Sequence, residues 1–131
     1  MRALIIGSTG FLGRNLCEYL AKAEIEYDTV GRDWLVPLDT KYDFVFYLAG
    51  EVRNVEAMWD ANLNLLYKML CRFIHMKQCV FIYVGSSSEY GHMDRPMKET
   101  DPINPIDFYS TTKGMGTKVN ISWQEYALYC W

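Results

Sequence analysis

Short apolar runs alternate along this chain with stretches whose apolar residues recur at helical spacing. The runs at residues 3–6, 42–50 and 79–84 have the length and composition of buried strands, and residues 26–30 are interpreted as a further strand. Between the strands at 3–6 and 26–30, leucines at positions 12, 16 and 20 lie one turn apart and predict a helix over residues 14–23. Strands that alternate with helices in this way indicate an α/β protein with a parallel sheet.

A longer helix is predicted over residues 54–76, where one stripe at 3.6-residue spacing contains a single polar residue. The stripe consists of Val55, Met58, Trp59, Asn62, Leu66, Met69, Leu70 and Phe73. Because Asn62 lies among apolar residues, we expect it to be a buried amide that is hydrogen-bonded to backbone. Another helix is predicted to begin at Phe108.

The segment at residues 34–39 has two interpretations. As a third strand it would be confined to a sheet edge, because Pro37 cannot donate a ladder hydrogen bond. Too few residues separate it from the run at 42–50 for the crossover that joins parallel strands. Either the usual helix is missing there, or the segment is not a strand. Near the other end of the chain, residues 126–131 are expected to begin a further strand.

Glycines at positions 7, 10 and 13 occupy the turn between the first predicted strand and the first predicted helix. Gly7 permits a sharp turn, Gly10 permits close approach of a diphosphate, and Gly13 lets the helix lie against the strand. The helix N-terminus directs free N–H groups and its positive dipole end at the phosphates. Glycine triplets also occur in ordinary loops, but the strand-turn-helix context favours a dinucleotide-binding turn.

Arg32 follows the second predicted strand, at the position where a dinucleotide fold meets the adenosine ribose. A guanidinium there pairs with a 2′-phosphate, whereas an acidic residue accepts hydrogen bonds from a free 2′-hydroxyl. Arg32 therefore favours NADP as the cofactor. NAD remains an alternative, because Asp33 follows at once and could take the ribose itself.

Composition excludes several other classes of protein. The chain has 131 residues, half of them apolar, which suits one domain with its own core. A net charge of −3 argues against the basic surface that binding to nucleic acid or to an anionic membrane requires. No apolar run approaches the length of a membrane span, and Met1 and Arg2 lead directly into the first strand, so we expect no signal peptide and a cytoplasmic location. The cysteines and the two histidines lack the spacing of a metal site or a disulfide framework.

Several side chains that could take part in ligand binding or proton transfer lie in the second half of the chain. Serines at 86–88 follow an apolar strand, where open α/β sheets bind ligands. A proline-rich stretch at 94–107 is irregular and long enough to be a functional loop. Tyr109 and Lys113 then lie one turn apart on one helical face.

Taken together, these motifs resemble the extended short-chain dehydrogenase/reductases, which are the nucleotide-sugar epimerases, dehydratases and reductases. The glycine turn, Leu48 and Ala49, Asn62, the segment 86–91, the series Glu99, Pro102 and Pro105, and Tyr109 with Lys113 fall where that family's pattern puts them. The resemblance covers nearly the whole chain. It implies a Rossmann-like, doubly wound parallel sheet that is incomplete at its C-terminal end.

The resemblance also implies roles for individual residues. Tyr109 would exchange a proton with a sugar hydroxyl or keto oxygen, and Lys113 would hold the nicotinamide ribose and favour the phenolate through its charge. Ser87 would hydrogen-bond the substrate oxygen; counting back from Tyr90 gives Ser86 instead, because this turn is one residue shorter than usual. The expected cofactor-binding residues are Gly7, Gly10, Phe11, Leu12, Gly13, Arg32, Leu48, Ala49, Asn62, Tyr109 and Lys113.

Some positions depart from that pattern. Gly114 and Gly116 lie inside the predicted catalytic helix, and Thr117 stands where the family commonly has Glu. Glu89 resembles the extra acid of the dehydratase branch, but we expect it to be a surface glutamate.

Family members are also longer than this chain. Residues 1–131 are therefore expected to be the NAD(P)-binding domain alone, without the C-terminal substrate domain. Two functions follow as alternatives: a nucleotide-sugar oxidoreductase, expected to be a homodimer, or a non-catalytic NADP-binding module or partner subunit.

Overall fold

The computed structural model describes residues 1–30, 40–76 and 78–129, and these form two compact units. Unit 1 contains Met1–Gly50 and His75–Val84, and unit 2 contains Glu51–Ile74 and the chain from Gly85 onward. The predicted segment at 34–39, together with Arg32 and Asp33, lies outside the described residues. Within the described residues, no helix is both long and apolar enough to cross a lipid bilayer.

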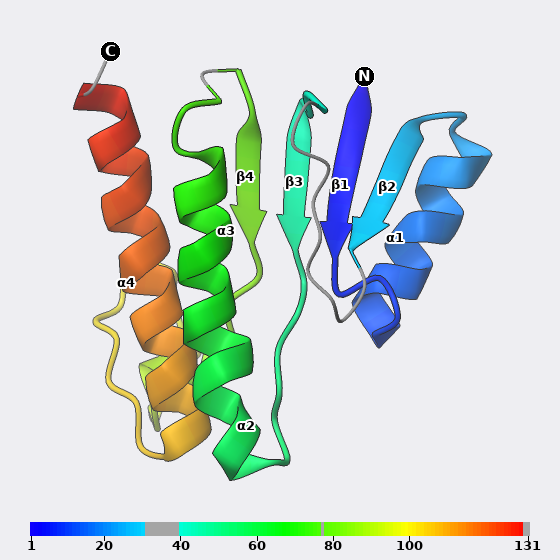
Figure 1. Cartoon of the computed structure of the whole chain (residues 1–131). Coiled ribbons are helices and arrows are strands. Elements are labelled where there is room, and N and C mark those ends of the chain that lie inside the picture. Colours follow the sequence, from blue (N-terminus) through cyan, green and yellow to red (C-terminus); the bar gives the residue numbers. More distant parts are fainter. Residues whose placement is uncertain (31–39, 77, 130–131) are drawn as a thin grey trace. The chain divides into compact units, whose positions relative to one another are not determined.

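Unit 1 is built on a four-stranded, all-parallel sheet with the order β2-β1-β3-β4 (Figure 1). The strands are β1 (Arg2–Ile6), β2 (Glu26–Val30), β3 (Phe44–Tyr47) and β4 (Val80–Tyr83). The four strands predicted at residues 3–6, 26–30, 42–50 and 79–84 are therefore present, although β3 is shorter than the predicted run. This sheet confirms the Rossmann-like α/β class.

The core of unit 1 lies between β1 and helix α1 (Phe11–Lys22). Ala3 and Ile5 alternate along one face of β1 and pack with Leu20 of the helix. Leu4 and Ile6, on the other face of β1, are fully buried as well. Burial on both faces explains why β1 is a continuous apolar run rather than an alternating one.

The strand register places the carboxyl ends of β1, β2, β3 and β4 at one edge of the sheet. Ile6 pairs with Val30 on one side and with Tyr47 on the other, and Tyr47 pairs with Tyr83. From β1 the chain goes to β2 at the sheet edge and then returns to β3 on the opposite side of β1. The carboxyl ends of β1 and β3 therefore form a topological switch point, where open α/β sheets bind ligands.

Unit 2 consists of helices, and its first helix confirms the prediction for residues 54–76. Helices α2 (Val55–Trp59), η1 (Asp60–Asn64) and α3 (Leu65–Phe73) follow without a break (Figure 1). The middle segment η1 has π-helical geometry. Short π segments inside α-helices are rare and occur often at functional sites.

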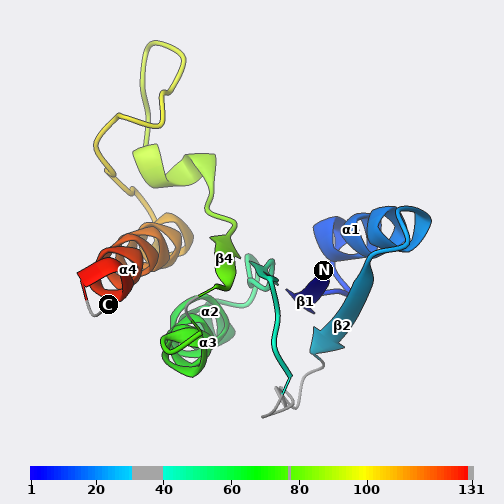
Figure 2. The ribbon, with the colours of Figure 1, turned by 90° about the horizontal axis from the view of Figure 1, so that it is seen from above.

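The second long helix of unit 2, α4 (Phe108–Tyr129), packs against α2, η1, α3 and the short 3₁₀ helix η2 (Ser87–Tyr90). Figure 2 shows α4, η2 and the loop that joins them from above. The strand predicted at 126–131 is wrong, because α4 continues to Tyr129. Residues 117–129 contain no glycine or proline, so an established helix propagates through them.

Gly114 has a packing reason to lie inside α4. A Cβ atom there would lie 2.8 Å from the Cγ2 atom of Ile103 and 3.9 Å from the Cβ atom of Glu89. The missing side chain therefore allows the loop and η2 to approach the helix closely, which offsets part of the roughly 1 kcal/mol that glycine costs in a helix.

Candidate functional site

The turn between β1 and α1 lies at the switch point of unit 1. Gly7 has a φ angle of +93°, and a Cβ atom there would lie 2.6 Å from the backbone N atom of Ala49. A Cβ atom on Gly13 would collide with the carbonyl oxygen of Gly7 and lie 2.6 Å from the Cα atom of Ser8. The fold itself thus requires glycine at both positions, and it brings the predicted turn against Ala49.

Gly10 differs from the other two glycines. Its backbone is extended, with φ −73° and ψ 175°, and an added Cβ atom would meet only the carbonyl oxygen of Gly7, at an ordinary 3.4 Å. The protein's own packing therefore does not require glycine there. A ligand that approaches the backbone closely would require it.

The N-terminus of α1 is available to such a ligand. Gly10 is the N-cap, no side chain caps the helix, and its first turn contains no acidic residue. The first backbone N–H groups of a helix have no intrahelical partner. Phe11 and Leu12, in the first turn, have exposed side chains. Free N–H groups at a helix N-terminus can donate to an anion such as a diphosphate.

Leu48 and Ala49 follow β3 at the same edge of the sheet. The backbone N–H of Leu48 donates to the carbonyl oxygen of Ile6 at 2.8 Å, so this segment extends the β1–β3 pairing by one residue. Both side chains are half-buried. Unit 1 therefore brings the three glycines, Phe11 and Leu12 together with Leu48 and Ala49.

Asn62 lies in the π segment of unit 2 and is 1% exposed. Its Oδ1 atom accepts from the Glu51 N–H at 2.8 Å, and its Nδ2 donates to the Glu51 carbonyl at 3.0 Å and to Thr112 Oγ1 at 2.9 Å. The expectation of a buried amide bonded to backbone is confirmed. Both donor hydrogens are committed to the protein, so the predicted contact of Asn62 with a cofactor would use its second acceptor lone pair or act through its neighbours.

The N-terminal turn of α4 is fixed by its own side chains. Asp107 Oδ1 accepts from the Ser110 N–H at 2.6 Å, as an N-cap carboxylate does. Thr112, which receives the hydrogen bond from Asn62, donates its hydroxyl to the carbonyl oxygen of Tyr109 at 2.8 Å. This chain of bonds anchors the backbone of Tyr109 to the π segment.

Lys113 follows Tyr109 by one turn of α4. Tyr109 is half-buried, whereas Lys113 is only 5% exposed. Burial disfavours the ammonium and lowers the pKa of Lys113 from 10.5 to about 8, while the carboxylate of Glu89 acts in the opposite direction. At pH 7 the side chain is still mostly charged.

The three hydroxyl groups of the serine turn, Ser86, Ser87 and Ser88, differ in their partners and exposure. Ser86 is the N-cap of η2, and its Oγ atom bonds Ser88 Oγ at 2.7 Å and accepts from the Ser88 N–H at 3.3 Å. Ser87 begins η2 with an exposed side chain. Of the two candidates for the substrate-oxygen contact, Ser86 is thus engaged locally and Ser87 faces solvent.

Glu89 is not the surface glutamate that we expected. It is 2% exposed, and its two oxygens accept from the Ser86 N–H at 2.6 Å and from Thr117 Oγ1 at 2.7 Å. The sequence carried a signal for this arrangement, since Ser86 with Glu89 three residues later is the pattern of a capping box.

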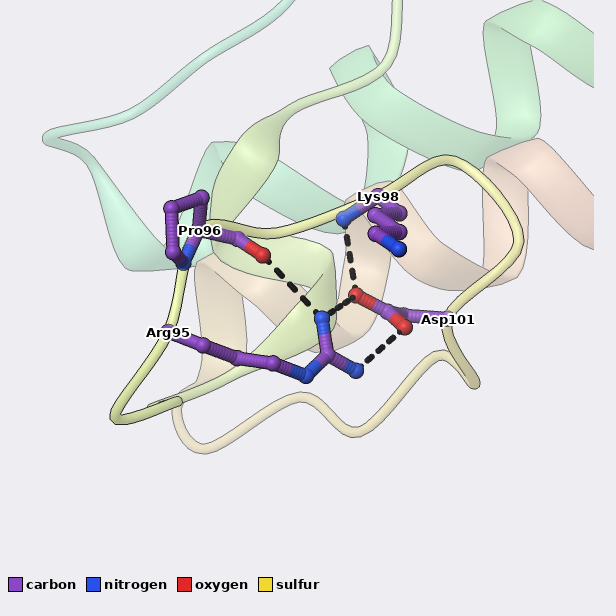
Figure 3. A network of polar contacts seen from close by, with 4 residues as sticks. All are labelled: Arg95, Pro96, Lys98 and Asp101. Atoms are coloured by element: carbon purple, nitrogen blue, oxygen red, sulfur yellow. Dashed lines mark hydrogen bonds and ion pairs between the residues drawn. The ribbon is translucent and has the colours of Figure 1, made fainter.

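The proline-rich loop before α4 is braced by an ion pair (Figure 3). The guanidinium of Arg95 donates to both carboxylate oxygens of Asp101, at 2.8 and 2.6 Å, and to the carbonyl oxygen of Pro96 at 3.0 Å. The Lys98 N–H also donates to Asp101, at 2.7 Å. Together these bonds lower the pKa of Asp101, so sequence irregularity here does not mean an unrestrained loop.

Metal ligands do not gather in the described part of the chain, where no group of three or more His, Cys, Asp or Glu residues could hold an ion. The three cysteines within that part, Cys17, Cys71 and Cys79, are free thiols.

Comparisons with known proteins agree with this architecture. Residues 3–130 match the model of the NAD dependent epimerase/dehydratase family. A curated UDP-2-acetamido-2,6-beta-L-arabino-hexul-4-ose reductase from Pseudomonas aeruginosa is 33% identical over 113 residues, a match that covers 76% of this chain and 30% of the reductase.

Two solved structures show the same fold. UDP-glucuronic acid 4-epimerase from Bacillus cereus in complex with NAD has a TM-score of 0.78 at 22% identity, over 95% of this chain and 53% of that one. RMD from Pseudomonas aeruginosa complexed with NADPH has a TM-score of 0.75 at 22% identity, over 93% of this chain and 49% of that one. The chain thus spans about half the length of these structures.

The family match extends over nearly the whole sequence and includes the glycine turn, the serine turn and the Tyr109–Lys113 pair. This chain belongs to the NAD dependent epimerase/dehydratase family.

Proposed function

We propose that this chain supplies the NAD(P)-binding and catalytic residues of an oxidoreductase, epimerase or dehydratase that acts on a nucleotide sugar. The observation that carries the proposal is the turn at the switch point. There, Gly7 and Gly13 are required by packing, while a Cβ at Gly10, beside an uncapped helix N-terminus, would meet only the Gly7 carbonyl oxygen, at 3.4 Å. A dinucleotide diphosphate fits such a turn, because it needs both the N–H donors and the close approach.

The substrate class follows from the relatives. The curated reductase and the epimerase structure are named for sugars linked to UDP, and family membership of this chain makes the same class of substrate the first to test. A bound nicotinamide supplies or accepts the hydride in such reactions. The remaining steps require a group that moves a proton and groups that hold the substrate.

Tyr109 is the residue that we assign to the proton step. Tyr109 exchanges the proton with the sugar oxygen, as a general acid/base. Lys113 lies one turn later, and we assign it to the nicotinamide ribose. In this assignment Ser87, whose side chain is exposed, hydrogen-bonds the substrate oxygen.

Replacement of Tyr109 by phenylalanine tests the chemistry. In a complete protein that contains these residues and a substrate domain, with NADPH and a panel of 4-keto UDP-sugars as reactants, Tyr109→Phe is expected to lower turnover by about 10² to 10⁴, the usual size of a general acid/base contribution. Cofactor affinity should stay within a few-fold. A Tyr109→Phe protein that keeps most of its activity would rule the assignment out. Cofactor binding by that complete protein without turnover of any sugar would instead support a non-catalytic binding module.

Arg32 is the residue that we assign to cofactor choice. Its guanidinium would pair with the 2′-phosphate of NADP, so the chain should bind NADPH more tightly than NADH. Fluorescence titration of both nucleotides measures this, with Arg32→Ala expected to weaken NADPH binding and to leave NADH binding nearly unchanged. Equal affinities before and after the substitution would contradict a role for Arg32 in the choice.

A further inference from the structure

Glu89 is a buried carboxylate that the proposed function leaves without a role. It is 2% exposed, and a carboxylate removed from water requires hydrogen bonds or an opposite charge. Both of its oxygens accept hydrogen bonds from protein groups. The side chain is therefore engaged inside unit 2 rather than directed at solvent, which argues against a role as the base that removes a proton from a substrate carbon.

The two hydrogen bonds of Glu89 join different elements. One oxygen accepts from the backbone N–H of Ser86, which opens the serine turn. The other accepts from the hydroxyl of Thr117, on α4. Gly85, which precedes Ser86, also lies against this group, since a Cβ there would be 2.8 Å from Glu89 Oε1. One side chain thus ties the serine turn to the helix that carries Tyr109.

The same carboxylate faces the side of α4 that carries Lys113. Thr117 follows Lys113 by four residues and shares its face, and the Thr117 hydroxyl is 2.7 Å from Glu89. Lys113 is 5% exposed, so its ammonium has lost most of its hydration and gains from a nearby negative charge. In agreement, Glu89 raises the pKa of Lys113 against the larger, opposite effect of burial.

Other ionisable groups on the elements around α4 offer less compensation. Tyr109 on α4 and Tyr90 in η2 are half-buried phenols. The acidic residues of the α2–η1 segment, Glu56 and Asp60, have exposed side chains. The ionisable side chains of α3 are Tyr67, Lys68, Cys71 and Arg72, none of them acidic. Among these groups, Glu89 is the carboxylate that is buried and that acts on the buried ammonium of Lys113.

We propose that Glu89 is a positioning residue, which fixes the serine turn to α4 through Ser86 and Thr117 and provides the counter-charge for the buried ammonium of Lys113. Its consequence for catalysis rests on the proposed function, because Ser87 and Lys113 are assigned to the reaction there. The tie and the counter-charge themselves are properties of unit 2 and can be measured without substrate or cofactor.

The counter-charge is tested by titrating Lys113 in proteins with isotope-labelled lysine, with the signal assigned by its loss in Lys113→Met. Glu89→Gln keeps the shape of the side chain and can keep both hydrogen bonds, but removes the charge. It is expected to lower the pKa of Lys113 by about one unit or more. Thr117→Val keeps the carboxylate, so the pKa of Lys113 should change by less than about half a unit. An unchanged pKa of Lys113 in Glu89→Gln would overturn the proposal.

The tie is tested by amide hydrogen exchange at Ser86. Thr117→Val removes the α4 end of the tie and should speed exchange at Ser86 by several-fold. Thr111→Val is the matched control on the same helix, because the hydroxyl of Thr111 bonds only the carbonyl oxygen of Asp107. The same exchange rate at Ser86 in both variants would show that Glu89 does not couple the turn to α4.

A Glu89→Gln protein that fails to fold is still informative. If the loss of the negative charge near Lys113 is the cause, then Glu89→Gln combined with Lys113→Met should fold again, and failure of the double variant would contradict the counter-charge. NADPH titration of the same samples separates the two proposals. A protein that shows the Lys113 shift but binds no cofactor refutes the proposed function and leaves the role of Glu89 intact.

Discussion

Two glycines of the glycine turn are needed by the fold, and the third is the one that we assign to a ligand. The positive φ of Gly7 and the collision at a Gly13 Cβ are consequences of the fold. At Gly10 an alanine would meet only an ordinary contact. The roles expected from the strand-turn-helix context follow the same division, and the positions of Ala49 and of the Gly7 carbonyl supply the contacts that the sequence does not contain.

The lowered pKa of Lys113 predicts a pH dependence of stability. The folded pKa is about 8 and the ordinary value is 10.5, so between these two values the unfolded chain binds more protons than the folded chain. The contribution of Lys113 to the free energy of unfolding therefore rises with pH across this window. The rise is at most about 3 kcal/mol, since one pKa unit corresponds to about 1.4 kcal/mol.

Urea unfolding of the parent chain and of Lys113→Met, at pH values from 7.5 to 10.5, measures this effect as a difference. The free energy of unfolding of the parent minus that of the variant should increase over the window. Taking the difference removes other titrations, such as that of Cys79, whose pKa burial raises to about 11. A difference that stays constant with pH would contradict the burial of a charged Lys113.

At the scale of elements, the π segment η1 holds the amide that links two parts of unit 2. Asn62 bonds the backbone of Glu51 in both directions and also Thr112. Asn62→Ala should lower the free energy of unfolding by about 2 kcal/mol, because it leaves buried backbone groups without partners. Asn64→Ala is the control in the same segment. Asn64 is exposed and bonds Asp60, so this change should stay within about 0.5 kcal/mol.

Denaturant unfolding of Asn62→Ala and Asn64→Ala measures the two free energies of unfolding that this prediction compares. Equal effects would mean that the bonds of Asn62 add nothing to the stability of unit 2. The sequence predicted the burial of Asn62 from its place in an apolar stripe, but it did not predict the π geometry, which depends on how the helix accommodates its neighbours.

Helices and strands that have a clear pattern of apolar residues within their own segment were predicted well from the sequence. The strand β2 was predicted at its observed bounds, and β1, β3, β4, α1 and the α2–α3 helix were predicted from apolar periodicity. The end of α4 was predicted wrongly, because tyrosine and cysteine near residue 130 suggested a strand while the uninterrupted helix favoured continuation. The burial of Glu89 was also missed, since its environment is created by Thr117, far away in the sequence.

On the scale of the whole molecule, the residues of the proposal are divided between the two units. Unit 1 carries the glycine turn with Leu48 and Ala49, and unit 2 carries Asn62, the serine turn, Tyr109 and Lys113. Variants can therefore examine each unit separately: those at Glu89, Asn62 and Lys113 concern unit 2, and Gly10→Ala concerns unit 1.

The most direct test of the central claim, that this chain binds a nicotinamide dinucleotide at its glycine turn, is a fluorescence titration of NADPH into the parent chain and Gly10→Ala. The parent chain should bind NADPH saturably. Gly10→Ala should weaken binding by about tenfold or more, or at least about 1.4 kcal/mol, because its Cβ atom occupies the approach of the diphosphate. Its free energy of unfolding should stay within about 0.5 kcal/mol of the parent value. Absence of binding by the parent chain, or equal affinity of the two proteins, would contradict the account.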